Sequence, residues 1–462
     1  MLHNLREIKK YALKANNTFK IYSDKVWLNG KLQAATISIA SEKIAKIAIA
    51  QQETDAIDFS GKIIMPGVID AHVHINEPGR TDWEGFQTAS RAAARGGTTT
   101  LVDMPLNSSP VVTTVEAFQK KIKATQNKLF VNCGFWAGAI NAAVEELREL
   151  IAAGCLGVKV FLSDSGLDEF PNITLTDLAT LMEGLKDLNV PVLAHCELDT
   201  LPADNSLLSN PRNYNAYLKS RPKLWENEAI KAFINLSEKY QCKAHIVHLA
   251  SDEALDFIIQ KKKNNIPFTV ETCTHYILFY AEEIADGNTL FKCAPPIRNK
   301  NNGRHLRKAI KKGIIDFMTT DHSPAPPAIK EIESGDFSKA WGGIAGLQFL
   351  LSASWTALKD ELSLEEFIPL LTSKPAKFLA LQNSIGKIAL GYDADICIWN
   401  PAASFLVTEQ MIEHRHKITP YLGRRLFGKV AATIVNGQFA FQNEKLSQTP
   451  FGKRFHGQKK ID

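Results

Sequence analysis

The sequence predicts an α/β protein, a (β/α)8 barrel of the TIM type with a small β-sandwich domain built from both ends of the chain. Residues 65–385 alternate short apolar runs with longer helical segments, and eight such strand-then-helix units are the pattern of this barrel. Residues 18–64 and 386–445 instead show short alternating runs, which are typical of strands. The composition, 45% hydrophobic and 22% charged, is ordinary for a globular protein with a sizeable core.

The two flanking segments are assigned to one domain because both carry the same hairpin signal. Asn-Gly pairs stand at 29–30 and 436–437 between apolar runs, where a two-residue turn connects antiparallel strands. Strand-rich ends that flank a barrel can pair into one small sheet. We expect residues 1–17 to be a polar N-terminal lead-in and residues 446–462 to be a polar C-terminal tail.

The barrel strands are expected in order along the central segment. They cover 67–74, 98–105, 129–136, 157–161, 190–197, 242–250, 267–275 and 313–322. Helical segments lie between most of them, such as 81–97, which ends at a Gly-Gly stop, and 173–189, which opens with a threonine cap signal. We expect the active site at the carboxyl ends of these strands, where barrel enzymes place it.

Charge, hydropathy and cysteine usage argue against several classes of function. The net charge of +5 is mild for 462 residues, and the basic stretches at 261–263 and 298–307 are short, so we expect solvated faces and no nucleic-acid surface. No stretch approaches the roughly 18 apolar residues of a membrane span, and residues 1–17 lack a signal-peptide pattern. The seven cysteines form no C-x-x-C pair, which favours reduced thiols in a cytoplasmic protein.

Two histidines on the first expected strand are candidate metal ligands. His72 and His74 lie two residues apart, so their side chains share one face of an extended strand, together with Asp70. Near the carboxyl end of a barrel strand they can share one metal ion. Taken alone, the pair also fits two hydrogen-bonded structural histidines, which is the commoner situation.

Lys159 stands in the middle of an apolar strand. A buried ammonium group is costly unless it is paired or neutral. One interpretation is a lysine whose head reaches water at the strand end. The other is a desolvated, neutral amine that reacts with carbon dioxide. The resulting N6-carboxylysine is an anionic ligand with two oxygens, which can bridge two metal ions.

Three further candidates close the fifth, sixth and eighth strands: His195, His248 and Asp321. His245 points to the opposite face of the strand from His248, so we expect a structural or supporting role, and Asp316 at the start of its strand is expected to be structural. Nitrogen and oxygen donors gathered at one barrel mouth predict two divalent metal ions bridged by the carboxylated lysine. Donors without cysteine favour zinc, with cobalt, iron and manganese as alternatives.

The chain resembles the metal-dependent amidohydrolases from about residue 19 to residue 442. Within them it is similar to the cyclic amidohydrolases, which are allantoinases, hydantoinases, dihydropyrimidinases and dihydroorotases. The stretches most similar to allantoinases are "HINEPGRTDWEGFQTASRAAARGGTTTLVDMPLNS", "CTHYILFYAEEI", "FKCAPPIRN", "TTDHSPAPP" and "KAWGGIAGLQ". The resemblance implies metal ligands at His72, His74, Lys159 (as N6-carboxylysine), His195, His248 and Asp321, with Asp321 also the catalytic base.

The resemblance also implies where the substrate lies. Dihydroorotases usually carry arginine at the position of Asn76, and its absence removes a bidentate partner for a substrate carboxylate. Allantoin has a neutral ureido group there, so Asn76 is a candidate substrate-binding residue. Backbone contacts to the ring amides are implied at Ala294, which stands where serine is commoner, and at Ile344 and Ala345.

The implied function is hydrolysis of the hydantoin ring amide of allantoin to allantoate, in purine catabolism, by a homo-oligomer that is a dimer or a tetramer. The first alternative is another cyclic amide hydrolase, either hydantoinase-, dihydropyrimidinase- or dihydroorotase-like. The second is a non-catalytic scaffold, which we would expect to have lost ligands. A mononuclear deaminase of the same superfamily would not require Lys159.

Overall fold

Parallel strands form a ring at the centre of the molecule. The computed structural model describes residues 18–457 and 459–461. The barrel strands are β6 (Val68–Val73), β7 (Thr98–Asp103), β8 (Asn132–Phe135), β10 (Val158–Phe161), β11 (Val192–His195), β12 (Ala244–Ile246), β13 (Phe268–Cys273) and β14 (Phe317–Thr319). Neighbours pair in parallel from β6 to β8 and from β10 to β14.

Two short connections join these runs into a closed ring. After Phe135, β9 (Ala137–Gly138) follows β8 and pairs in parallel with β10. On the other side, Val73 of β6 bridges to His322, and the amide of His74 donates to the carbonyl of His322 at 2.7 Å. The predicted fold class, a (β/α)8 barrel with an added β domain, is confirmed.

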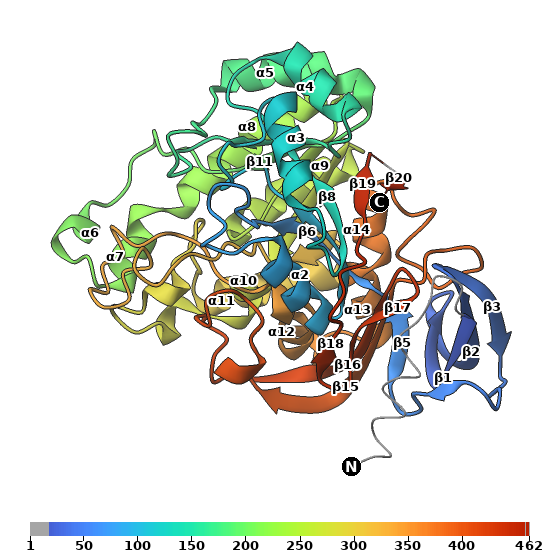
Figure 1. Ribbon diagram of the computed structural model, residues 1–462. Helices are drawn as coiled ribbons and strands as arrows, with labels where there is room; N and C mark the ends of the chain where they lie inside the picture. Colours follow the sequence, from blue (N-terminus) through green and yellow to red (C-terminus); the bar gives the residue numbers. More distant parts are fainter. Residues whose placement is uncertain (1–17, 458, 462) are drawn as a thin grey trace.

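Helices surround the barrel (Figure 1). They are α2 (Phe86–Arg95), α3 (Val115–Ala124), α4 (Val144–Ala152), α5 (Leu175–Leu185), α6 (Ser206–Ser209), α7 (Tyr214–Ser220), α8 (Lys223–Tyr240), α9 (Leu255–Lys263), α10 (Thr274–Leu278), α11 (Lys300–Lys311), α12 (Leu350–Leu358), α13 (Leu364–Leu371) and α14 (Ser373–Phe378). The expected threonine cap is present, since the Thr174 side chain accepts from the Asp177 amide at the start of α5.

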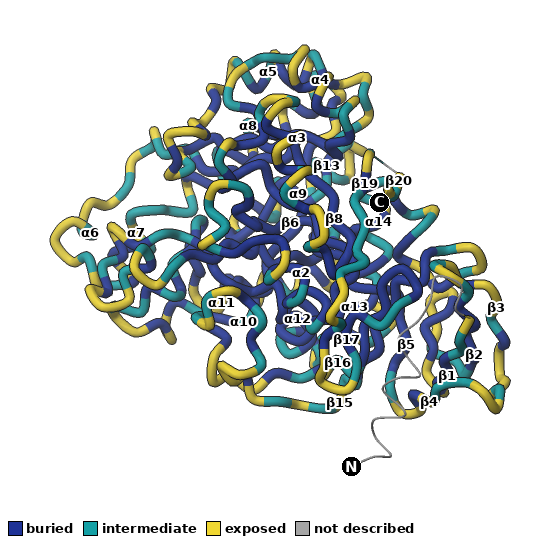
Figure 2. Tube along the Cα trace, in the orientation of Figure 1, coloured by how far each residue is buried: buried dark blue, intermediate teal, exposed yellow. Residues whose placement is uncertain are grey.

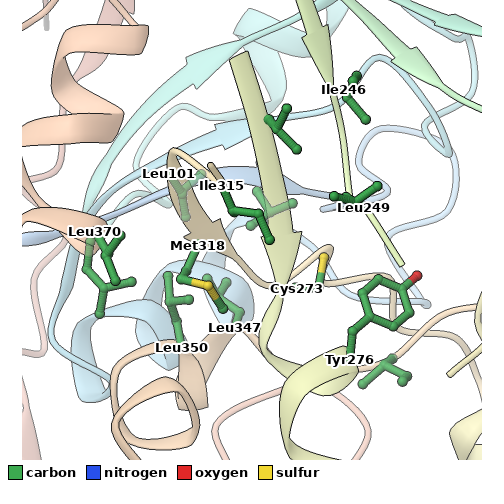
Figure 3. Close-up of a cluster of buried hydrophobic side chains, with 14 of the residues drawn as sticks. Leu101, Ile246, Leu249, Cys273, Tyr276, Ile315, Met318, Leu347, Leu350 and Leu370 are labelled. Atoms are coloured by element: carbon green, nitrogen blue, oxygen red, sulfur yellow. The ribbon is translucent and has the colours of Figure 1, made fainter. Parts of the chain in front are cut away.

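The main core lies between the outer face of the barrel and these helices. Figure 2 shows that buried chain fills the middle of the molecule, and exposed chain lies at its periphery, in loops, in turns and on the outer sides of helices and strands. In Figure 3, the side chain of Met318 on β14 ends beside Leu347 and Leu350, and all three belong to this core. Because these strands are covered on both faces, they appear in the sequence as continuous apolar runs.

Strands from both ends of the chain form a second sheet, which has nine strands among the described residues. They are β1 (Thr18–Leu28), β2 (Lys31–Ala40), β3 (Lys43–Ile49), β4 (Ile57–Asp58), β5 (Ile63–Pro66), β15 (Ile396–Leu406), β16 (Arg425–Val435), β17 (Gln438–Gln442) and β18 (Lys445–Leu446). The central strand β5 pairs with β1 from one end of the chain and with β15 from the other. The amide of Ala394 donates to the Glu42 carbonyl at 2.7 Å, which ties the two ends of the chain together. The sheet has its own core, which contains Ile37, Ile64 and Ile434.

The end of the chain differs from the polar tail expected over 446–462. β19 (Arg454–His456) and β20 (Lys459–Ile461) form a hairpin, and β19 pairs with β8 of the barrel. Phe455 is buried, and the Lys460 ammonium lies 2.9 Å from the carboxylates of Asp393 and Asp395. A segment anchored by one apolar ring and one buried ion pair lacks the hydrophobic alternation by which strands are predicted. The lead-in expected at 1–17 lies outside the described residues.

Candidate metal centre and active site

The side chains predicted as ligands line one cavity of about 540 Å³ at the carboxyl ends of the barrel strands. Each lies on a strand or within two residues of its end: His72 on β6 with His74 just after it, Lys159 on β10, His195 on β11, His248 after β12 and Asp321 after β14. The structure therefore brings together all the predicted ligands, which fall into two groups.

The first group joins β6 to the segment after β14. Oδ1 of Asp321 lies 3.1 Å from Nε2 of His72 and 3.3 Å from Nε2 of His74. The opposite ring nitrogens are fixed, since Nδ1 of His72 donates to Glu271 at 2.5 Å and Nδ1 of His74 donates to the Leu106 carbonyl at 2.8 Å. Candidate ligand atoms from His72, His74 and Asp321 lie within 4.8 Å of one another, a spacing that fits one shared cation.

The charges of this group also fit a cation. Burial lowers the pKa of His72, but the carboxylates of Asp321 and Glu271 outweigh it and raise that pKa to about 9. Burial raises the pKa of Asp321, but His72 and His74 hold it well below its usual range. The ionised carboxylates of Asp321 and Glu271 thus lie beside the imidazoles of the first group. Because these side chains are buried, their negative charge favours a divalent cation.

The second group joins β11 to the segment after β12. Nε2 of His195 donates to Glu197 at 2.8 Å, which leaves its Nδ1 facing Nε2 of His248 at 3.0 Å. Arg221 donates from two nitrogens to the carboxylate of Glu197. Burial raises the pKa of Glu197, but Arg221 and His195 bring it down to about 2. Glu197 therefore stays ionised and orients the His195 ring.

Lys159 lies buried on β10 beside this second group. Its Nζ has no hydrogen-bond partner among the described residues and lies 4.7 Å from the centre of the Phe161 ring, which stacks on His195. Burial lowers the pKa of Lys159 to about 8, although Asp321 and Glu271 oppose the shift. An amine that is easily neutralised and has no partner fits a side chain completed by carboxylation.

Asp70, which shares the inward face of β6 with His72 and His74, holds the backbone on both sides of the first group. Its buried carboxylate accepts from the amide of His72 and from the amide and hydroxyl of Thr320. The next residue, Asp321, has φ 46°, and His248 has φ 40°. Left-handed backbone at two non-glycine residues is strained, and it is held here by the contacts around the candidate ligands.

Of the residues expected to contact substrate, Ala294 lines the cavity. Asn76 is buried behind the wall instead: its Nδ2 donates to the Pro324 carbonyl at 3.2 Å and its Oδ1 accepts from Asn107 at 3.2 Å. Asn107 itself lines the cavity. Asn76 has φ 68°, and through its bond to Asn107 its side chain supports a residue of the cavity wall.

The carbonyl groups of Ile344 and Ala345 are engaged within the protein. The Ile344 carbonyl accepts from the Ser323 amide at 3.0 Å, and the Ala345 carbonyl accepts from the Thr419 hydroxyl at 2.6 Å. Ser323 lines the cavity, whereas Ile344 and Ala345 are not among its described lining residues. Substrate contacts from these two residues stay predictions.

Sequence reasoning missed the two carboxylates that orient the histidines. Glu271 bonds His72 through one oxygen and His245 through the other, and the His245 ring is packed against Phe378. His245 thus supports the candidate ligand His72 through Glu271, and a supporting role was one of the two expected for it. The signal that singled out Lys159, a charged residue inside an apolar strand, would also have found Glu271. Glu197 carried no such signal, because it stands at the end of its expected strand, where a charged residue is ordinary. Its pairing with Arg221 is seen only in the folded chain.

Comparisons with known proteins agree with this geometry. The model of the amidohydrolase family matches residues 63–440. An allantoinase of Arabidopsis thaliana is 41% identical over 406 residues, which are 84% of this chain and 80% of the plant protein. An allantoinase of Saccharomyces cerevisiae is 35% identical over 451 residues, 94% of this chain and 97% of the yeast protein.

Solved structures agree with the fold over nearly the whole chain. An L-hydantoinase (dihydropyrimidinase) from Arthrobacter aurescens superposes with a TM-score of 0.87 at 25% identity, covering 95% of this chain and 100% of that one. A D-hydantoinase (dihydropyrimidinase) from Thermus sp. gives 0.86 at 25% identity, covering 95% and 99%. The family model covers most of the chain, and the cluster of His72, His74 and Asp321 fits a divalent metal ion. The chain therefore belongs to the amidohydrolase family.

Proposed function

We propose that this protein is an allantoinase, which hydrolyses the hydantoin ring amide of allantoin to give allantoate in purine catabolism. The observation that carries the proposal is sequence identity of 35–41% to plant and yeast allantoinases over most of the chain. The complete set of candidate ligands around one cavity supports a working enzyme and argues against a non-catalytic scaffold.

The proposed cofactor is a pair of divalent metal ions, with zinc best matched to nitrogen and oxygen donors. The residues that would hold it are His72, His74, His195, His248, Asp321 and N6-carboxylated Lys159. Such a centre lowers the pKa of water to about 7 and polarises a carbonyl group. Glu271 and Glu197 orient His72 and His195 for this role.

Asp321 is the proposed catalytic base. Its carboxylate lines the cavity, and its lowered pKa keeps it ionised at neutral pH. It can therefore accept a proton from the attacking water and return it to the ring nitrogen that leaves, so no second acid is required. Burial of the ligand cluster keeps bulk water away from these charges and strengthens their interactions.

A hydantoinase or dihydropyrimidinase is the second candidate, because the solved structures that superpose on the chain carry these names. Metal-replete protein should be assayed with allantoin, hydantoin, dihydrouracil and dihydroorotate, beside a chelator-treated sample. We expect kcat/KM for allantoin to exceed the others by about 100-fold or more. Preference for hydantoin or dihydrouracil would instead identify the second candidate, and full activity after chelation would contradict the metal centre.

We further propose a cytoplasmic homo-oligomer. All seven cysteines lie in the described part of the chain as buried free thiols, which supports a reducing compartment. No helix among the described residues is both long enough and apolar enough to span a membrane. The dimer or tetramer implied by the family resemblance stays a prediction, which light scattering on purified protein would test.

A further inference from the structure

A second, larger cavity of about 870 Å³ lies at the amino-terminal end of the barrel strands, opposite the metal centre. Phe268 and Phe317, the first residues of β13 and β14, contribute to its wall. Phe378 at the end of α14 and Pro191 before β11 add further apolar surface. The size and the mostly apolar lining are those of a small-molecule site.

Lysines surround this apolar wall. Lys243, Lys374, Lys377 and Lys459 line the cavity, and none forms an ion pair within residues 18–457 and 459–461. Asp316 also lines the cavity, and its carboxylate is already engaged: it pairs with Lys262 at 2.6 Å and accepts from the Val270 amide at 2.7 Å. Among the described residues, the cavity lining therefore carries more positive than negative charge, beside an apolar surface.

Two of these lysines lie on α14. Lys374 and Lys377 are three residues apart on one helix, so they share a face. Lys374 is partly buried, and this burial lowers its pKa; Asp316 acts against the shift, and Lys262 adds to it. A partly desolvated ammonium without a contacting counter-ion is an unfavourable arrangement that an anionic ligand would relieve.

We propose that this cavity binds a small amphipathic anion, with an aromatic or aliphatic body against the half-buried side chains of Phe378, Val190 and Ile266 and one acidic head on Lys374 and Lys377. A neutral apolar molecule would leave the lysines unpaired, and a small inorganic anion would leave these half-buried apolar side chains in water. The chemistry of the wall and the rim is satisfied together only by a ligand that has both parts. The site is separate from the metal centre and serves no step of the proposed hydrolysis.

The probe for a first test is 8-anilinonaphthalene-1-sulfonate, added to the metal-loaded, full-length protein and followed by its fluorescence. Decanoate and decan-1-ol serve as competitors with the same apolar body and different heads. We expect one saturable site from which decanoate displaces the probe at about tenfold lower concentration than the alcohol. Equal competition by decanoate and decan-1-ol overturns the proposal. The absence of saturable binding, as when a second copy of the chain covers the cavity, overturns it too.

Variants locate the site. Lys374→Gln with Lys377→Gln should weaken probe binding about tenfold, whereas the matched control, Lys31→Gln with Lys445→Gln, removes two exposed lysines of the second sheet and should bind like wild type. Both proteins should hydrolyse allantoin at the wild-type rate. Lys377 is exposed, so the single Lys377→Gln protein gives a second reading if the double variant does not fold. Equal affinity in the cavity and control variants overturns the proposal.

Discussion

The two halves of the metal centre differ in how far the protein itself satisfies their polar atoms. In the half formed by β6 and the segment after β14, each ring nitrogen of His72 and His74 has a partner in the described chain. In the half formed by β10, β11 and β12, Nζ of Lys159 and Nδ1 of His248 are buried with none among the described residues.

This difference indicates that the first half is assembled by the fold alone, whereas the second half depends on a group that the fold does not supply. Buried polar atoms without partners are rare in native proteins and point to an added ligand or a modification. Carboxylation of Lys159 would place two oxygen acceptors in this second half. The two halves should therefore respond differently to substitution, to metal titration and to pH.

The largest effect is expected at Asp321, which belongs to the preassembled half and is also the proposed base. Asp321→Asn should lower kcat/KM for allantoin by about 10²- to 10⁴-fold, because the amide cannot accept the proton from water. The matched control is Asp316→Asn, the same change at the start of the same strand, where the carboxylate pairs with Lys262. Similar loss of activity in both variants would show that the change acts through folding.

The second prediction concerns the half that the fold leaves incomplete. Lys159→Ala should bind one metal ion in place of two and lose about 10²-fold or more in activity, because the bridging carboxylate is gone. Propionate should restore part of that activity by occupying the space left by the lysine side chain. Lys159→Met fills the space without an amine, so propionate should not rescue it. Two metals and full activity in Lys159→Ala would remove the bridging role.

The barrel and the candidate ligands of both halves were predictable from the sequence, for a physical reason. Barrel strands are short, apolar and buried on both faces, so His195 and Lys159 within them are conspicuous, and strand parity places their side chains. What escaped prediction depends on contacts between distant segments. Glu197 is recognised by its pairing with Arg221. Asn76 was a candidate because arginine is usual at its position in dihydroorotases, and only the folded chain shows that its amide bonds Asn107 and the Pro324 carbonyl.

The third prediction separates the halves through the carboxylates that orient them. Glu271→Gln should weaken metal binding at the His72 side and Glu197→Gln at the His195 side, each by about 10- to 100-fold. Stepwise zinc titration by calorimetry should therefore show one weakened and one unchanged site in each variant. Weakening of both sites together in either variant would mean that the centre assembles as one unit.

The smallest effect is a pH dependence that belongs to the incomplete half alone. Only a neutral amine reacts with carbon dioxide, and the lowered pKa of Lys159, about 8, makes the neutral fraction rise from about 3% at pH 6.5 to about 50% at pH 8. Activation of metal-free protein by zinc, at a fixed partial pressure of carbon dioxide, should accelerate about 15-fold across that range. From pH 8 to 9.5 it should then increase less than about twofold, because the amine is already largely neutral. Each sample is assayed at one common pH, so that only activation is compared. A lysine with the ordinary pKa of 10.5 would continue to gain about 30-fold over the upper range, and that result would contradict a desolvated Lys159.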